Sequence, residues 1–491
     1  MKRTGAVVRR LGLSLAWGAL GVVVGGAAVL IYVTRSGPTL ELWHRVELDA
    51  EFTAARADEI DTFSDYQLLE DQLFAQLDAE VYAHTGTGVP FTLARYSAGS
   101  AADPRQRRPN WNRSFELPSD PASGGILLLH GMSDSPYSLR ALGEAFNRQG
   151  HWVVGLRLPG HGTAPSGLTT VRWEDMAAAV RLGVDHLVSK VGPAPIHIVG
   201  YSTGAPLALD YVLEIGDDGP RPRPASLVLI SPSIAITPVA ALAKWQRRLA
   251  FVPGLERLAW TTVLPEFDPY KYNSFATNAA DQVHRLTRSV AARIETRAGA
   301  SLIEGFPPTL VFLSTVDATV SADAVIDNLL EHLAPHRHEL VLFDVNRFSV
   351  NRTVLVSDPG PLTARLMAND ALPFAVTVLT NESDESAGVV SRHKTSLSDQ
   401  ISTRSLPFTW PAGVISLSHV ALPFPPDDPL YGQRKPENEE LLQLGQIAVQ
   451  GELGMLQVPS DWLLRLRHNP FYDFLADRAL DWVSNVAPSN N

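Results

Sequence analysis

The most constraining feature of the sequence is a serine held between two glycines, Gly200-Tyr-Ser-Thr-Gly204. The apolar run before it, over residues 196–199, is typical of a buried parallel strand. After it, apolar residues recur at helical spacing over 207–212. The chain therefore passes from a strand through a tight turn into a helix, with Ser202 at the apex. Such a turn lifts the serine oxygen clear of the chain, and the glycines leave room for strand and helix to approach. We predict that Ser202 is a nucleophile.

Composition limits the remaining possibilities. The chain has 491 residues, of which 45% are hydrophobic and 19% charged, enough for one large globular domain with insertions or for two domains. Its net charge of −11 at pH 7 argues against nucleic acid as a partner. The absence of cysteine excludes disulfides, thiolate metal sites and a thiol nucleophile. No ligand cluster and no glycine-rich phosphate loop stands out, so we expect no metal and no cofactor.

The N-terminal segment predicts a membrane anchor. Residues 11–33 carry no charge, a length that spans about 30 Å of hydrocarbon. The basic residues before it place the N-terminus in the cytoplasm and the rest of the chain on the other side. A cleaved signal peptide is the alternative, although its apolar core would be about 7–15 residues long. We therefore expect a single-pass protein of the inner (cytoplasmic) membrane with a periplasmic, extracytoplasmic catalytic domain. The basic residues are Lys2, Arg3, Arg9 and Arg10.

The remainder of the chain divides into segments with different sequence patterns. Two helix-like stretches, 40–52 and 65–82, precede a polar linker. From residue 113, strand-like and helix-like runs alternate, which predicts a parallel sheet covered by helices on both faces. An aromatic-rich interruption would lie over the carboxyl edge of the sheet, where we expect it to receive an acyl chain. The expected segments are 1–36, basic tip and anchor; 37–112, helical region and linker; 113–233, first part of the core; 234–306, helical cap; 307–345, second part of the core; 346–413, insertion; and 414–491, histidine loop and C-terminal helices.

A serine hydroxyl needs a base oriented by a carboxylate, and on this architecture the chain order is serine, acid, histidine. Asp317 follows the predicted strand 309–313 and is our candidate acid, with Asp344 as the alternative. His419 follows a predicted strand over 414–417 and is our candidate base. His468 is its competitor.

The intermediate of acyl transfer needs two N–H donors for its oxyanion. We predict that the N–H of Thr203, directly after the nucleophile, is one donor. The second comes from the loop after the strand 125–129, where the N–H of Met132 is suitably placed. Gly131 lets that backbone come close, and we expect His130 to brace the loop by hydrogen bonding.

Several stretches together resemble the α/β-hydrolase superfamily, and within it the bacterial carboxylesterases and monoacylglycerol lipases. They are HGMSDSPYSLRALGEAF, GLRLPGHGTAPSGL, HIVGYSTGAPLAL, STVDATV and SHVALPF. The resemblance implies a mostly parallel, eight-stranded sheet with helices on both faces and a cap. It also implies the roles given above to Ser202, Asp317, His419, Met132 and Thr203.

One departure from the family is the distance of about 70 residues between Phe343 and Val414. Either 339–343 is the last strand, with a long excursion before the base, or 414–417 replaces it. The family resemblance implies a serine hydrolase of carboxylic esters. The predicted membrane anchor and the aromatic-rich cap favour a lipid-like substrate, such as a monoacylglycerol or a lysophospholipid. Two alternatives stay open: acyl transfer through the same triad, and a non-catalytic interaction protein on a hydrolase scaffold.

Overall fold

The computed structural model describes residues 14, 16–22, 24–26, 37–216, 221–234, 254–299, 301–317, 319–349, 358–433, 441–445 and 465–485. Most of the predicted anchor, residues 11–33, lies outside this part. The described residues among 14–26 are helical. Within the described ranges, none of the helices combines the length and the apolar character that a bilayer crossing requires.

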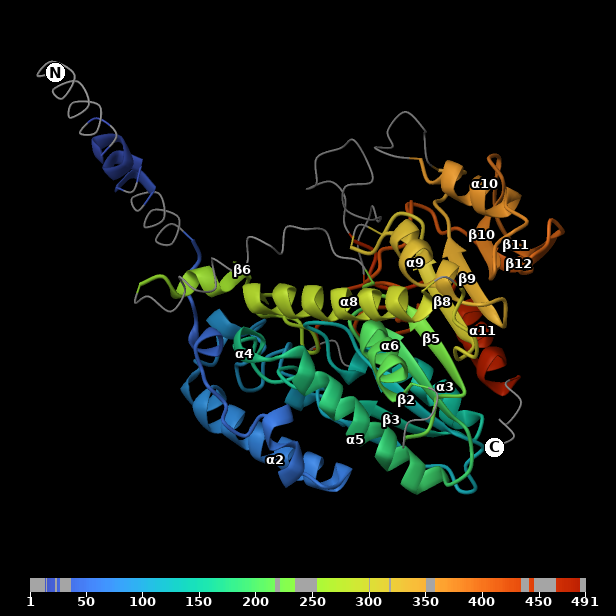
Figure 1. Cartoon of the computed structure of the whole chain (residues 1–491). Coiled ribbons are helices and arrows are strands. Elements are labelled where there is room, and N and C mark those ends of the chain that lie inside the picture. Colours follow the sequence, from blue (N-terminus) through green and yellow to red (C-terminus); the bar gives the residue numbers. More distant parts are fainter. Residues whose placement is uncertain are drawn as a thin grey trace, which may run out of the picture.

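One large twisted sheet organises the molecule (Figure 1). Seven of its strands run parallel in the order β3-β2-β4-β5-β8-β9-β10, and β1 pairs antiparallel with β3 at one edge. At the other edge, β11 and β12 continue from β10 as an antiparallel meander. The bounds are β1 Phe115–Leu117, β2 Gly125–Leu129, β3 Trp152–Leu156, β4 Ile196–Tyr201, β5 Ser226–Ile230, β8 Thr309–Ser314, β9 His338–Phe343, β10 Ala375–Ser383, β11 Ser386–Lys394 and β12 Ile401–Thr409.

The parallel strands are apolar throughout because both faces of the sheet are covered. In β2, Leu127 and Leu129 pack into one core with the helices of one face, whereas Ile126 and Leu128 pack into a second core on the other. Figure 1 shows these two helix layers with the sheet between them. The first layer holds α5 (Trp173–Val191), α6 (Gly204–Ile215) and α8 (Thr277–Ala298), and the second holds α3 (Arg140–Arg148) and α11 (Tyr472–Ser484).

The prediction of a mostly parallel sheet is confirmed, but its expected size is wrong: the described residues form ten strands of this sheet rather than eight. The excursion after β9 supplies the difference. It forms α10 (Gly360–Ala368) and then β10, whose residues 375–379 pair in parallel with 339–343 of β9. Two further strands follow in the same excursion. The long excursion of our first alternative is therefore present, but 339–343 is not the last strand, because β10, β11 and β12 follow it in the sheet.

The predicted strand 414–417 is wrong, because β10 already occupies the place beside β9. The segment instead runs past the end of the sheet as a loop tied to Asn346. The Asn346 N–H donates to the carbonyl oxygen of Ile415 at 2.7 Å, and its Nδ2 donates to that of Val414 at 2.8 Å. This loop then leads to His419.

The second predicted N-terminal helix, 65–82, is confirmed as α2 (Phe63–Glu80), which begins with a capping box between Thr62 and Asp65. The first, 40–52, is wrong. Its only helical part is a 3₁₀ turn over Leu42–His44, since tertiary hydrogen bonds hold the chain in other conformations. The Nε2 atom of His44, for example, lies 2.9 Å from Ser274 Oγ.

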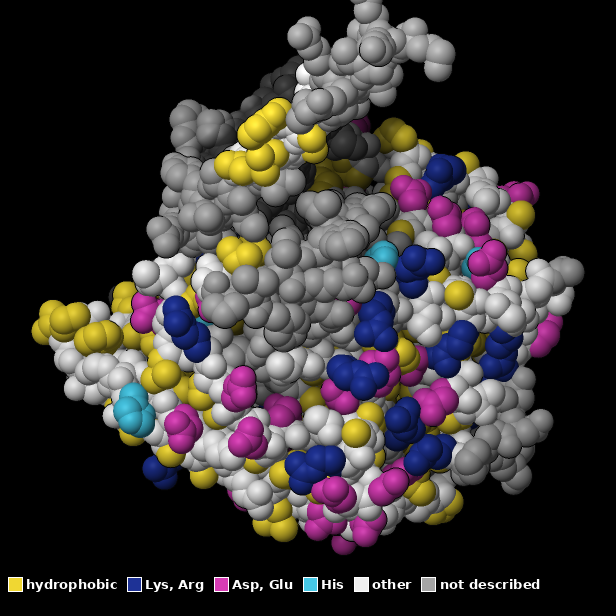
Figure 2. All heavy atoms as spheres, turned by 60° about the vertical axis from the view of Figure 1, so that its left-hand side comes forward, with side chains coloured by type: hydrophobic (Ala, Val, Ile, Leu, Met, Phe, Trp, Pro, Cys, Tyr) yellow, Lys and Arg dark blue, Asp and Glu magenta, His cyan; other side chains and the backbone are white. Residues whose placement is uncertain are grey.

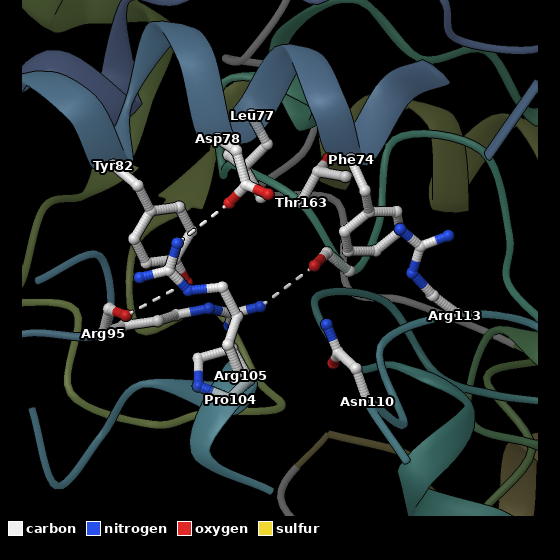
Figure 3. A pocket seen from close by; sticks show the side chains of 11 residues that line it. Phe74, Leu77, Asp78, Tyr82, Arg95, Pro104, Arg105, Asn110, Arg113 and Thr163 are labelled. Carbon is white, nitrogen blue, oxygen red and sulfur yellow. Dashed lines mark hydrogen bonds and ion pairs between the residues drawn. The ribbon is translucent and has the colours of Figure 1, made fainter. Parts of the chain in front are cut away.

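The N-terminal region is packed firmly on the core. The buried guanidinium of Arg157, just after β3, binds Glu51 at 2.8 Å and Glu70 of α2 at 3.0 Å. Beneath α2 lies a small cavity of about 90 Å³ whose wall includes Arg105, stacked 3.5 Å from the Tyr82 ring centroid (Figure 3). Arg105 also binds Asp78 at 3.0 Å, so its charge is neutralised within the wall.

Within residues 234–306, the structure describes residue 234 and the part from residue 254 onward, apart from residue 300. Its long helix α8 lies beside α6, and its Leu286, Val290 and Ile294 belong to the core of that layer. In the expected segment of C-terminal helices, 414–491, residues 441–445 are not helical, and residues 446–464 lie outside the described part. Acidic and basic side chains are interspersed over the lower half of the face in Figure 2, as the composition suggests.

Candidate active site

Ser202 stands at the turn between β4 and α6, as predicted, with φ of +52°. This is the left-handed region, which costs a non-glycine residue about 1 kcal/mol or more. Hydrogen bonds hold it there: the Ser202 N–H donates to Ile230 O at 2.9 Å, and the Ala205 N–H donates to Ser202 O at 3.2 Å. The backbone strain thus lies at Ser202 itself, and the turn presents the side chain of this residue at the carboxyl edge of the sheet.

Both flanking glycines are required by close packing. A Cβ atom on Gly204 would lie 2.0 Å from the carbonyl oxygen of Leu129, at the end of β2. One on Gly200 would lie 2.6 Å from the Cα atom of Ala205. The helix α6 can therefore start directly against the sheet only because neither position carries a side chain.

The loop after β2 lies against the nucleophile. A Cβ atom on Gly131 would lie 3.0 Å from the Cβ atom of Ser202, so Gly131 permits the approach that the sequence predicts. Within the described ranges, neither the N–H of Met132 nor that of Thr203 donates to another protein group. Two N–H groups beside a serine oxygen are what an oxyanion requires.

His130 is bound on both ring nitrogens and is buried. Its Nε2 atom accepts the N–H of Leu158 at 3.0 Å, so Nδ1 carries the proton and donates to Gly131 O at 2.8 Å. Burial, reinforced by the neighbouring His161, holds the pKa of His130 well below its usual value. Burial likewise lowers the pKa of His161 to about 4. A neutral His130 braces the loop, as we expected.

Asp317 and His419, far apart in the chain, meet at this edge of the sheet. The Nδ1 atom of His419 lies 3.6 Å from Asp317 Oδ1, and the Asp317 side chain is fully shielded from solvent. The backbone of His419 also reaches the strand of the nucleophile, since the Tyr201 hydroxyl donates to His419 O at 3.5 Å. The structure thus brings Asp317 and His419 together and places His419 beside the end of β4, next to the turn that carries Ser202.

The competing residues are held elsewhere. Asp344 forms a two-pronged ion pair with Arg347, at 2.7 and 2.9 Å, and accepts the Thr380 hydroxyl at 2.8 Å. His468 is buried, and its Nδ1 atom lies 3.2 Å from Tyr431 O. Burial lowers the pKa of His468. Neither residue takes part in the pairing of Asp317 with His419.

The structure adds polar neighbours that the sequence did not indicate. Ser233, three residues after the end of β5 at Ile230, places its hydroxyl oxygen 3.2 Å from that of Ser202. At His419 Nδ1, Thr319 Oγ1 lies at 3.1 Å and Arg465 Nη2 at 3.0 Å. Position just beyond a parallel strand is a signal that could have indicated Ser233. No comparable signal exists for Arg465, which comes from a distant segment.

The Arg465 contact has a chemical consequence. A guanidinium N–H can only donate, so this contact requires a His419 Nδ1 without a proton. A base oriented by Asp317 carries its proton on Nδ1. The side chain of Arg465 must therefore give up this position when His419 pairs with Asp317.

Comparisons with known proteins found a family and several similar proteins. The profile of the Alpha/beta hydrolase family matches residues 126–353. The chain is 26% identical over 208 residues to the thermostable monoacylglycerol lipase of Bacillus sp. (strain H-257), covering 42% of this chain and 76% of that protein. Among solved structures, it is similar to the monoacylglycerol lipase of Paleococcus ferrophilus, at 18% identity and a TM-score of 0.36, covering 47% and 88% of the two chains. It is also similar to a soluble variant of the monoglyceride lipase of Saccharomyces cerevisiae, at 14% identity and 0.36, covering 47% and 82%.

Proposed function

Because residues 126–353 form an alpha/beta hydrolase domain, we propose that the protein is a serine hydrolase that cleaves carboxylic esters. The observation that carries this proposal is the strained Ser202 at the apex of the β4–α6 turn, with the Gly131 loop against it. A left-handed serine supported by two obligatory glycines is costly for a turn that only connects two elements. It is the geometry that a nucleophile requires.

In this proposal, Ser202 Oγ attacks the ester carbonyl while His419 accepts its proton at Nε2. Asp317 fixes the imidazole through Nδ1 and stabilises the imidazolium that forms. The N–H groups of Met132 and Thr203 bind the oxyanion. His419 then protonates the leaving alcohol, and water activated by the same imidazole releases the acid from the acyl-enzyme.

We propose a lipid-like ester as the substrate class, such as a monoacylglycerol or a lysophospholipid. Support comes from the similarity to the Bacillus monoacylglycerol lipase.

We also propose that residues 11–33 anchor the protein in the inner membrane, with the hydrolase domain outside the cytoplasm. The basic N-terminal residues and the uncharged run support this topology. Membranes from cells that express the full chain should retain the protein after washing at alkaline pH. Protease added to spheroplasts should digest the domain, whereas digestion only after lysis would contradict the orientation.

The experiment that tests the catalytic proposal uses the full-length protein in detergent. It should hydrolyse p-nitrophenyl esters and monoacylglycerols, and Ser202→Ala should abolish both activities. Ser189→Ala, on the outer side of α5, is the matched control and should retain full activity. Equal turnover by wild type and Ser202→Ala would reject the proposal.

A further inference from the structure

A charged pair lies beside the nucleophile in the structure. Asp134, in the loop after β2, is 5% exposed, and its Oδ2 atom lies 2.8 Å from Lys271 Nζ. The same Oδ2 atom lies 3.0 Å from the position that a Cβ atom on Gly131 would occupy, and so does the Cβ atom of Ser202. The carboxylate therefore packs on the glycine that also touches the nucleophile.

The residue after Lys271 holds the same loop at a second point. The Tyr272 N–H donates to Ser133 O at 2.8 Å, and Ser133 itself has φ of +64°. Two successive residues of one segment thus bind two successive residues of the loop. The loop is fixed in position and in orientation directly after Met132.

The segment that carries Lys271 is itself rigidly held. Asp268 Oδ1 accepts the N–H groups of Tyr270 and Lys271, at 3.0 and 3.1 Å. The Tyr431 hydroxyl lies 2.8 Å from both carboxylate oxygens of Asp268. Lys271 is therefore presented to Asp134 from a fixed support.

Stability alone is a poor explanation for this pair. Burying the carboxylate of Asp134 carries a desolvation cost that offsets its attraction to the ammonium, and apolar replacements of such pairs are often as stable. Burial raises the pKa of Asp134, and the ammonium of Lys271 opposes this rise, with a smaller contribution from His419. The ammonium of Lys271 thus favours the charged form of Asp134, which is a buried carboxylate next to the predicted active-site residues.

We propose that Asp134 and Lys271 are positioning residues that clamp the oxyanion loop, so that the Met132 N–H points to the oxyanion formed at Ser202. This inference rests on the proposed function, since an oxyanion forms only if Ser202 Oγ attacks a carbonyl group. The clamp itself is a property of the loop. Its effect on the loop can therefore be measured separately from its effect on catalysis.

The test uses the full-length chain with Asp134→Asn, Lys271→Met, the double variant and Lys271→Arg. We expect kcat to fall roughly 10- to 100-fold in each single variant with KM within twofold, because a misplaced oxyanion donor costs transition-state binding. The double variant should be no slower than the worse single variant, since both changes break one interaction. Lys271→Arg keeps the charge and should recover most of kcat.

Two further readouts separate positioning from a merely structural role. A trifluoromethyl ketone inhibitor, which forms an oxyanion on the enzyme, should lose affinity in step with kcat in Asp134→Asn. Amide hydrogen exchange of residues 131–134 should accelerate in both single variants. The control is Asp210→Asn with Arg293→Gln, a partly buried ion pair between α6 and α8. It should lower the melting temperature without changing kcat or the exchange of the loop.

The outcomes distinguish the two proposals. If wild type does not hydrolyse esters, the proposed function fails, and hydrogen exchange still decides whether the clamp exists. If wild type is active but both single variants retain kcat within twofold, the clamp inference is overturned. A rise in KM at constant kcat would also overturn it, by making Lys271 a substrate-binding residue. If amide hydrogen exchange of residues 131–134 is unchanged in both single variants, the clamp inference is likewise overturned.

Discussion

The Nδ1 atom of His419 lies 3.6 Å from the Oδ1 atom of Asp317, and the aspartate side chain has no exposed surface. The loop of Asp317 holds the carboxylate in place, because Oδ1 accepts the N–H groups of Thr319 at 2.8 Å and Val320 at 2.9 Å. An imidazole that donates to such a carboxylate is fixed in one orientation. This arrangement gives Asp317 a defined role that a substitution can test.

We expect Asp317→Asn to lower kcat by about 10³- to 10⁴-fold, because an amide stabilises the wrong tautomer of the base. Steady-state hydrolysis of a p-nitrophenyl ester would measure this. Asp344→Asn is the matched control: it should lower the melting temperature by weakening the pair with Arg347, and leave kcat unchanged. The reverse pattern would make Asp344 the catalytic acid.

A second prediction concerns Gly204, in the turn that carries Ser202. A methyl group at residue 204 cannot fit 2.0 Å from the Leu129 carbonyl oxygen, so Gly204→Ala must displace α6 from the sheet. We expect a loss of about 3 kcal/mol or more in the free energy of unfolding, together with loss of activity. Chemical denaturation followed by circular dichroism would measure it.

The control for this variant is Gly388→Ala in β11, where the new methyl would meet only the ends of the Ser386 and Glu382 side chains, at 3.1 and 3.4 Å. Both side chains can move aside, so stability should change by less than about 1 kcal/mol. A stable, active Gly204→Ala would show that the turn tolerates a side chain and would contradict the packing argument.

The sequence predicted the fold best where the local pattern of apolar residues and glycines favours the same structure as the surrounding protein. The strand, turn and helix around Ser202 are each specified by neighbouring residues, so their structure could be predicted directly. Asp317 was placed by the same logic, as a carboxylate just beyond a buried strand. Its pairing with His419 follows from chain order on a parallel sheet, which brings the carboxyl ends of the strands to one edge.

Elements that depend on distant partners could not be predicted in this way. Residues 40–52 have helix-like spacing, yet their hydrogen bonds go to other segments, as that of His44 to Ser274 shows. Residues 414–417 do not form the expected strand, because β10, which belongs to the excursion after β9, pairs with β9 instead. The local spacing of apolar residues does not indicate which of two distant segments will pair with a given strand.

Stability should depend on pH through buried histidines. Burial lowers the pKa of His197 to about 3, and its Nδ1 atom lies 2.8 Å from Ser226 Oγ. The unfolded chain, with an ordinary pKa of about 6.5, binds a proton that the folded chain does not. Stability is therefore fully present above about pH 6.5 and is lost as the pH falls toward 3.

We expect His197→Asn to flatten the pH dependence of the free energy of unfolding between pH 6 and pH 4 by up to about 1.4 kcal/mol per pH unit. Urea denaturation at several pH values would measure the slope. His84→Gln, at an exposed position, is the control and should leave the slope unchanged. A slope that is equal in wild type and His197→Asn would show that His197 is not kept neutral by the fold.

The most direct measurement of the central claim is covalent labelling of the full-length protein with a fluorophosphonate, followed by mass spectrometry of its peptides. Ser202 must react as an activated nucleophile, so we predict one adduct, on the peptide that contains Ser202, and progressive loss of ester hydrolysis as it forms. Asp317→Asn should slow the labelling. Absence of an adduct at Ser202 in protein that hydrolyses esters, or full activity in the labelled protein, would contradict the account.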